Sequence, residues 1–128
     1  MPATPDAVQL TRELLRFNTI NPPGAEAACA QYLGDILKRA GSTVDYAEFA
    51  PTRMSLVAKI GGVSGKPPLG FTGHIDTVPL GAAAWKADAF GASMEGGKLY
   101  GRGASDMKSG IAAFVIAALG MADKLKNG

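Results

Sequence analysis

The stretch LGFTGHIDTVP, residues 69–79, decides the fold that we predict for this chain. Its first half is apolar or small, as in a strand of an α/β sheet, and its polar end stops at Pro79. Since residues i and i+2 of a strand point to the same side, His74 and Asp76 should face one cleft at the strand's carboxyl end. Open α/β sheets bind their ligands at that edge.

Helical patterns lie on both sides of this stretch. Thr4 and Pro5 predict a first helix with Thr4 as N-cap and Pro5 as its first residue. A second helix is expected from about Glu26 to Ala40, followed by Gly41 as a typical residue after a helix end. The third should run from residue 107 or 108 to residue 124.

Strand patterns are shorter. Alternation and β-branched residues predict strands over 43–49, 55–60 and 69–76, and a brief one over 98–100. Residues 80–97 are expected to form a loop anchored by Trp85 and Phe90. The element order predicts the α/β class, with helices packed on a mixed sheet.

Composition excludes several classes of function. The 128 residues, 47% of them hydrophobic, are enough for one domain with a core. A net charge of +2 without a basic and aromatic run argues against nucleic-acid binding. The one cysteine, Cys29, cannot form an intrachain disulfide and is expected to be buried. The longest apolar run, 110–122, is shorter than the roughly 18–20 residues of a membrane span, and no signal segment is evident, so a cytoplasmic location without membrane contact is expected.

Three residues could carry chemistry. Asp76 could accept the ring N–H of His74 and aim the other ring nitrogen at a metal, although an isolated His-x-Asp is more often structural. Asp106 follows a glycine-rich turn and precedes a helix, so it could be a helix N-cap or a metal ligand able to bridge two ions. Zn²⁺ accepts this mixture of imidazole and carboxylate.

Three cations lie near the same turn. Lys98, Arg102 and Lys108 could bind a substrate carboxylate, although solvated surface charges are the commoner case. A dinucleotide site is disfavoured, because Asp106 occupies the place of the third glycine of the fingerprint and would repel a pyrophosphate.

Two motifs together carry a family resemblance. The stretches GHIDTVP (73–79) and YGRGASDMKSG (100–110), with Trp85 and Phe90 between them, resemble the M20 family of metallopeptidases. That family includes acetylornithine deacetylases, succinyl-diaminopimelate desuccinylases and carboxypeptidase G2-like enzymes. The resemblance implies that His74 binds one metal, that Asp76 is the catalytic-site residue that orients it, and that Asp106 bridges two zinc ions, with cobalt or manganese as alternatives. It implies amide hydrolysis of N-acyl amino acids or short peptides.

The resemblance also sets limits. The glutamate pair of the family, its further acidic ligand and its late histidine should follow beyond Gly128, as should its inserted dimerisation domain. We therefore expect residues 1–128 to be the N-terminal part of a metal-binding catalytic domain of three-layer type, truncated after the helix that follows Asp106. Such a fragment should be inactive alone and prone to self-association, whereas the parent should be a homodimer. The alternative is a stand-alone non-catalytic binding or assembly module.

Overall fold

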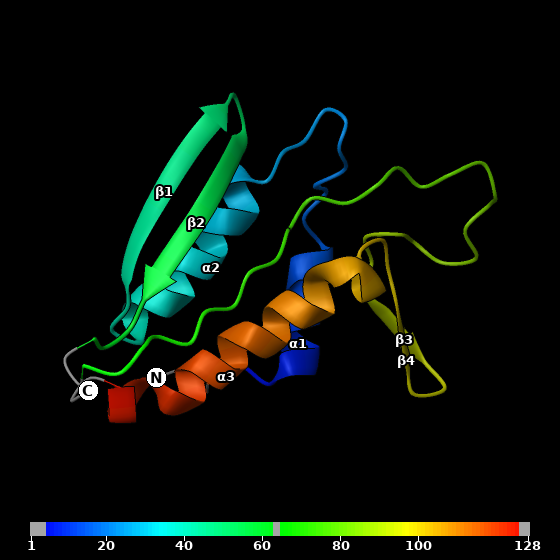
Figure 1. Ribbon diagram of the computed structural model, residues 1–128. Helices are drawn as coiled ribbons and strands as arrows, with labels where there is room; N and C mark the ends of the chain where they lie inside the picture. Colours follow the sequence, from blue (N-terminus) through cyan, green and yellow to red (C-terminus); the bar gives the residue numbers. More distant parts are fainter. Residues whose placement is uncertain (1–4, 63–64, 126–128) are drawn as a thin grey trace.

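The computed structural model describes residues 5–62 and 65–125. The elements, in chain order, are α1 (Ala7–Leu15), α2 (Ala27–Arg39), β1 (Thr43–Ala50), β2 (Arg53–Lys59), β3 (Ser93–Glu95), β4 (Lys98–Tyr100), η1 (Ala104–Lys108) and α3 (Ser109–Leu125). Figure 1 shows α2 lying along the β1–β2 hairpin, with β3 and β4 at the other end of the molecule. The α/β class is confirmed.

The helices form close to where the sequence predicts them. Helix α1 begins two residues later than expected, because Asp6 is the N-cap and its carboxylate accepts from the Gln9 N–H at 2.7 Å. The prediction of Pro5 as the first helical residue is therefore wrong, and Thr4 lies outside the described residues. Helix α2 ends at the expected place, where Gly41 adopts a φ of 98° after the C-cap residue Ala40.

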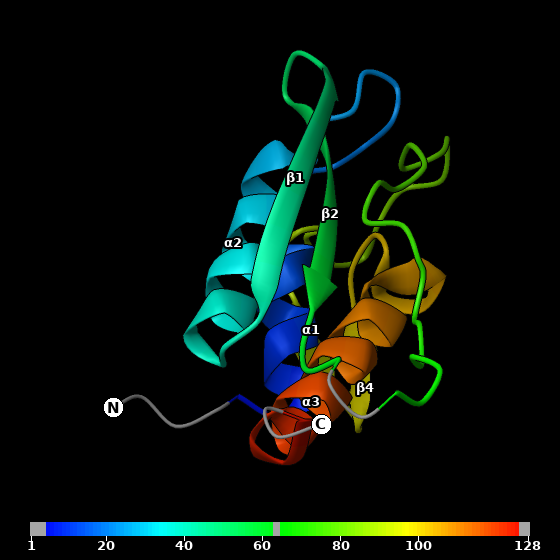
Figure 2. The same ribbon diagram turned by 60° about the vertical axis from the view of Figure 1, so that its left-hand side comes forward.

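One apolar core joins the three helices and the first hairpin. Helix α1 packs against α3, and α2 packs against β1 and β2 (Figure 2). The apolar stripe of α2 is buried on the side that faces this core, as the helical spacing predicts. The buried members are Leu10, Leu14, Cys29, Leu33, Ile36, Leu37, Ala112 and Val115.

The β structure differs from the prediction. Strands β1 and β2 pair antiparallel, with Thr43 opposite Lys59, and β3 and β4 form a separate antiparallel pair. Within the described residues, the only parallel pairing is an isolated bridge between Ile20 and Thr77, so the expected mixed sheet is reduced to two hairpins and this bridge.

The stretch that decided the predicted fold is extended but is not a strand of a sheet. Residues 69–76 have no strand beside them in the described part of the chain, so they lack the ladder of hydrogen bonds that defines a strand. The segment runs along α3 instead (Figure 1). The ring of Phe71 stacks on that of Phe114, with their centroids 4.8 Å apart.

The predicted loop over 80–97 contains strand β3. Gly96 and Gly97 have φ values of 56° and 75° and connect β3 to β4 as a two-residue turn. Gly-Gly is a typical residue pair for such a hairpin, because both turn residues need positive φ. The signal was therefore present in the sequence, and the prediction of a loop throughout was wrong.

The last helical stretch is longer than its apolar run suggested. By length and composition alone, Ala104–Leu125 would be able to cross a membrane, with a mean hydropathy of 1.3. A core helix passes the same test, and Ala112 and Val115 of α3 lie in the cluster that also contains Leu10 and Leu14. Helix α3 therefore packs against the core through these two residues.

Candidate functional site

His74 lies between two carboxylates. Its Nδ1 is 2.9 Å from Oδ1 of Asp76 and 3.0 Å from the Asp76 carbonyl oxygen, and its Nε2 is 2.9 Å from Oδ1 of Asp106. The prediction that His74 and Asp76 share a side of their segment is confirmed by this contact. The structure also brings Asp106, which is 32 residues away in sequence, to the same imidazole ring.

Asn21 completes the row of polar groups. Its side-chain amide donates to Oδ2 of Asp76 at 3.0 Å, which leaves Oδ1 of Asp76 to His74. Asn21 was not identified as a site residue in the sequence analysis. The available signal was a polar amide directly before Pro22, since a residue before proline is held in an extended conformation.

The backbone after α1 holds the His74 segment in place. The Asn21 N–H donates to the Thr77 carbonyl at 2.7 Å, and the Thr77 N–H donates to the Thr19 carbonyl at 3.0 Å. The buried Thr19 hydroxyl donates to the Ile75 carbonyl at 2.6 Å. These bonds replace some of those that a neighbouring strand would make, and they fix the direction in which His74 and Asp76 point.

A glycine turn brings Asp106 to His74. Gly103 has a φ of 89°, and a Cβ atom there would lie 2.6 Å from Cγ2 of Thr77, so both its conformation and its lack of a side chain are needed. The Asp106 carboxylate hydrogen-bonds His74, and α3 begins three residues later, at Ser109. Asp106 is therefore not the N-cap of α3, and its carboxylate lies against the His74 ring instead.

Lys108 is neither a surface charge nor free to bind a substrate carboxylate. Its side chain is 1% exposed, and its Nζ donates to the carbonyl oxygens of Leu14 at 3.0 Å and Phe17 at 2.8 Å. Burial lowers the pKa of Lys108 below its ordinary value. Lys108 thus binds carbonyl groups at the C-terminal end of α1, where the helix dipole favours a cation.

The other two cations have different surroundings. The Arg102 guanidinium lies over the ring of Trp85, 5.2 Å from its centroid, while the Trp85 Nε1–H donates to the Leu80 carbonyl. Trp85 therefore anchors its loop to Arg102 and not to a sheet. Lys98 is exposed on β4, as a surface charge would be.

The carboxylates change the titration of the site. Partial burial lowers the pKa of His74, but its hydrogen bonds to the Asp76 carbonyl, Asp106 and the Asp76 carboxylate outweigh this effect and raise it overall. The hydrogen bond from Asn21 is the largest cause that lowers the pKa of Asp76. His74 and Arg53 lower this pKa further, and the three effects together outweigh burial, which raises it. The Asp76 carboxylate is therefore held in its charged, accepting form.

The donor atoms fit part of a metal site. Nε2 of His74 and Oδ1 of Asp106 converge at the wall of a cavity of about 160 Å³, and imidazole nitrogen with carboxylate oxygen is a common donor set for Zn²⁺. The Asp106 side chain is 81% exposed and so remains open to further ligands. In the part of the chain that the structure describes, no group of three or more His, Cys, Asp or Glu side chains is placed to hold a metal ion.

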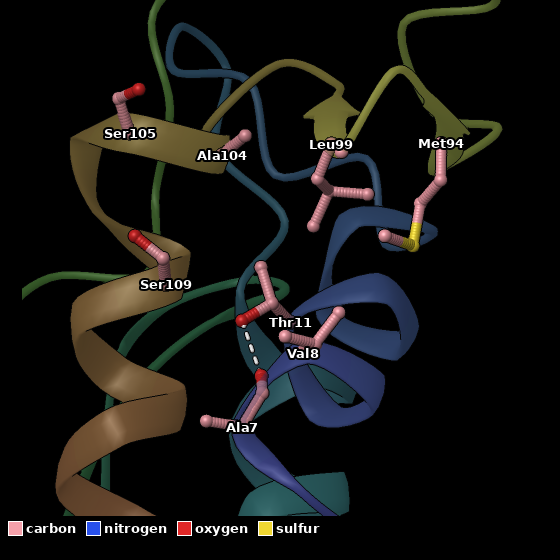
Figure 3. Close-up of a pocket in the computed structure, with 9 residues that line it drawn as sticks. Ala7, Val8, Thr11, Met94, Leu99, Ala104, Ser105 and Ser109 are labelled. Atoms are coloured by element: carbon pink, nitrogen blue, oxygen red, sulfur yellow. Dashed lines mark hydrogen bonds between the residues drawn. The ribbon is translucent and has the colours of Figure 1, made fainter.

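A larger cavity lies elsewhere but offers little chemistry. It has a volume of about 300 Å³ and lies between α1, the β3–β4 hairpin and the start of α3 (Figure 3). None of its lining residues is charged, and the Thr11 hydroxyl already donates to the Ala7 carbonyl at 2.6 Å. The lining residues are Ala7, Val8, Thr11, Met94, Gly97, Leu99, Ala104, Ser105 and Ser109.

An imidazole oriented by one carboxylate and facing a second is an arrangement typical of metal-dependent hydrolases. The family model described as peptidase family M20/M25/M40 matches residues 70–128, which include both His74 and Asp106. The chain belongs to the M20 family.

Several succinyl-diaminopimelate desuccinylases are similar in sequence to this chain over most of its length. A succinyl-diaminopimelate desuccinylase of Rhodopseudomonas palustris (strain BisA53) is 44% identical over 124 residues, which cover 93% of this chain and 31% of the relative. The proteins of the same name from Wolbachia pipientis subsp. Culex pipiens (strain wPip) and Methylocella silvestris are 42% and 44% identical, over 88% of this chain and 27% and 29% of their own lengths. The chain thus spans 27–31% of the length of these relatives.

Proposed function

We propose that this chain is the N-terminal part of a dizinc amide hydrolase that removes the succinyl group from N-succinyl-diaminopimelate. The observation that carries the proposal is the contact of Nε2 of His74 with Oδ1 of Asp106, which places a nitrogen donor and a carboxylate donor at one point. The substrate follows from the relatives, which are named succinyl-diaminopimelate desuccinylases, and the family indicates a hydrolase.

Each residue has a distinct task in this proposal. His74 would hold one zinc ion through Nε2, Asp106 would offer the oxygens of its exposed carboxylate to both ions, and Asp76 holds the imidazole through Nδ1. Bound zinc would lower the pKa of a water molecule and polarise the amide carbonyl. Cobalt or manganese would suit the same donors, because imidazole and carboxylate ligands do not select strongly among these ions.

The described residues account for only part of the chemistry. Two candidate direct ligands fall short of the three protein ligands that are usual at a catalytic zinc ion. We therefore propose that the 128 residues are inactive alone, and that the general base and the remaining ligands come from the part of the relatives' length that this chain does not cover. The homodimer and the cytoplasmic location expected from the sequence remain proposals for the whole protein.

A chimera tests the proposal directly. Residues 1–128 would be joined to the remaining sequence of the Rhodopseudomonas palustris relative, and the release of succinate from N-succinyl-diaminopimelate would be measured with added Zn²⁺. The chimera should turn over the substrate, and the variants His74→Ala and Asp106→Ala should abolish turnover. A folded chimera without activity, or one that keeps its activity in His74→Ala, would refute the proposed function.

The isolated chain provides the complementary test. It should show no hydrolysis of N-succinyl-diaminopimelate or N-acetyl-ornithine above background with Zn²⁺ or Co²⁺. Turnover that disappears in His74→Ala would contradict the claim of inactivity. The alternative of a stand-alone binding module predicts a folded, stable chain with weak or no binding of Zn²⁺ or Co²⁺, and a chimera without activity.

A further inference from the structure

The proposed chemistry assigns no task to the side chain of Asn21. Its side-chain amide lies at the wall of the cavity that Asp76, His74 and Asp106 also line. Because a carboxylate without a proton can only accept, the amide nitrogen must face Oδ2 of Asp76, at 3.0 Å. A continuous row of polar contacts then runs from Asn21 through Asp76 and His74 to Asp106, and the neutral ring can donate to only one of the two carboxylates.

We propose that Asn21 is a positioning residue, whose amide orients the Asp76 carboxylate so that His74 keeps its proton on Nδ1 and presents a bare Nε2 to a cation. The inference rests on the proposed metal-binding role of His74. It adds a residue from the loop after α1 to a site otherwise built from residues 74–76 and 106.

The geometry gives the physical reason. The last torsion of an aspartate side chain is broad, so the carboxylate of Asp76 would rotate if only His74 held it. The amide of Asn21 holds one oxygen, and the other then stays 2.9 Å from Nδ1 of His74. Nδ1 also faces the Asp76 carbonyl at 3.0 Å, so two acceptors favour the proton on this nitrogen.

The competing nitrogen has the weaker acceptor. Nε2 faces Asp106 alone, and that side chain is 81% exposed, against 31% for Asp76. Water screens the charge of Asp106 more strongly than that of Asp76. With Asp76 held in place the proton stays on Nδ1, and without Asn21 the preference for Nδ1 weakens.

The structural tasks of this loop do not need the amide. The Asn21 N–H, the Thr77 N–H and the Thr19 hydroxyl make the hydrogen bonds that join the loop to the His74 segment. A change of the Asn21 side chain leaves all three intact, so the loop should keep its position. This separation allows a test of the amide alone.

The readout is the position of a proton on one ring. His74 is the only histidine of the chain, so long-range ¹H–¹⁵N spectra of the metal-free protein show a single imidazole. The spectra would be recorded in alkaline solution, where the ring is neutral. Wild-type protein should show mainly the Nδ1–H tautomer. Asn21→Ala and Asn21→Leu should both shift the ring to a mixture with a several-fold larger share of Nε2–H.

Zn²⁺ affinity is the second readout. Loss of a group that orients a metal ligand typically weakens metal binding 10–100-fold, and because Asn21 acts through Asp76 we expect about a tenfold loss by calorimetry. Asn21→Leu keeps the volume of the side chain, so it separates loss of the donor from loss of packing. Asn18→Ala is the matched control, because it removes an exposed amide from the same loop whose oxygen accepts from the Ile20 N–H and does not face Asp76.

The outcomes separate this inference from the proposed function. An unchanged tautomer in both Asn21 variants, or a similar change in Asn18→Ala, overturns the role of Asn21, while loss of Zn²⁺ binding in His74→Ala would still support the metal site. If wild-type protein and chimera bind no Zn²⁺, the proposed function fails. A normal tautomer and affinity in Asn21→Leu but not in Asn21→Ala would show that packing is responsible and would also overturn the inference.

Discussion

Lys108 provides the sharpest test of the packing beneath the site. The perturbation is Lys108→Met, which keeps the length of the side chain and removes its charge and donors. In the native protein the Lys108 Nζ donates to the Leu14 and Phe17 carbonyl oxygens, and the side chain is 1% exposed. The substitution leaves two carbonyl groups at the end of α1 without these partners.

The magnitude follows from two opposing terms. A hydrogen bond from a charged donor contributes about 1.5–3 kcal/mol, so two bonds give about 3–6 kcal/mol. Removal of a buried ammonium group also removes its desolvation cost, which offsets part of this sum. We expect the free energy of unfolding to fall by about 2–4 kcal/mol. At about 4 °C per kcal/mol, the melting temperature should fall by about 8–16 °C.

The assay is thermal and urea unfolding followed by far-ultraviolet circular dichroism. Lys98→Met is the matched control, because Lys98 is exposed on β4 and its replacement should change the melting temperature little. The reasoning is refuted if Lys108→Met melts within about 2 °C of the wild-type protein, or if Lys98→Met is destabilised to the same extent.

Three further predictions concern other parts of the fold. Burial raises the pKa of the Cys29 thiol from 9.0 to about 11, so its contribution to stability is complete below pH 9 and is lost as the pH rises through 11. The loss should be about 3 kcal/mol in urea titrations and be absent in Cys29→Ala. Equal pH slopes for the two proteins would contradict it. Gly24→Ala should cost at least about 1 kcal/mol more than Gly81→Ala, because both residues have positive φ but only at Gly24 would a Cβ displace the Arg53 guanidinium from its ion pair with Glu26. Equal losses in urea unfolding would show that backbone strain explains both. Leu69 is 83% exposed, and an exposed apolar side chain favours self-association. The sedimentation coefficient of the chain should therefore rise with protein concentration, and it should rise less in Leu69→Ser. A wild-type chain that stays monomeric at all concentrations would contradict self-association.

Local patterns predicted the local elements well. The helix over 26–40 was bounded correctly to within a residue, because its apolar stripe and the following Gly41 are both encoded nearby in sequence. The hairpin of β1 and β2 follows from alternation in two neighbouring stretches. The common orientation of His74 and Asp76 also depends only on an extended backbone, so it holds although residues 69–76 are not a strand of a sheet.

Contacts between distant residues could not be predicted in this way. Nothing in the stretch around Lys108 indicates that the end of α1, more than 90 residues earlier, supplies two carbonyl groups for its ammonium. Composition alone makes a lysine a surface residue in most cases, which is why its burial was missed. The role of Asn21 was missed because its partner, Asp76, is 55 residues away in sequence.

The loop after α1 explains how the site keeps its geometry without a sheet around it. An extended segment with unpaired backbone groups would normally be free to move, and His74 and Asp76 would move with it. Thr19 and Asn21 satisfy the backbone groups of Ile75 and Thr77, while Gly103 lies close enough to Thr77 to exclude a side chain. Three separate parts of the chain are therefore fixed to one another at Thr77, one residue beyond Asp76. Further strands beside residues 69–76 would add stability to this arrangement, but the described contacts already determine the direction of the imidazole.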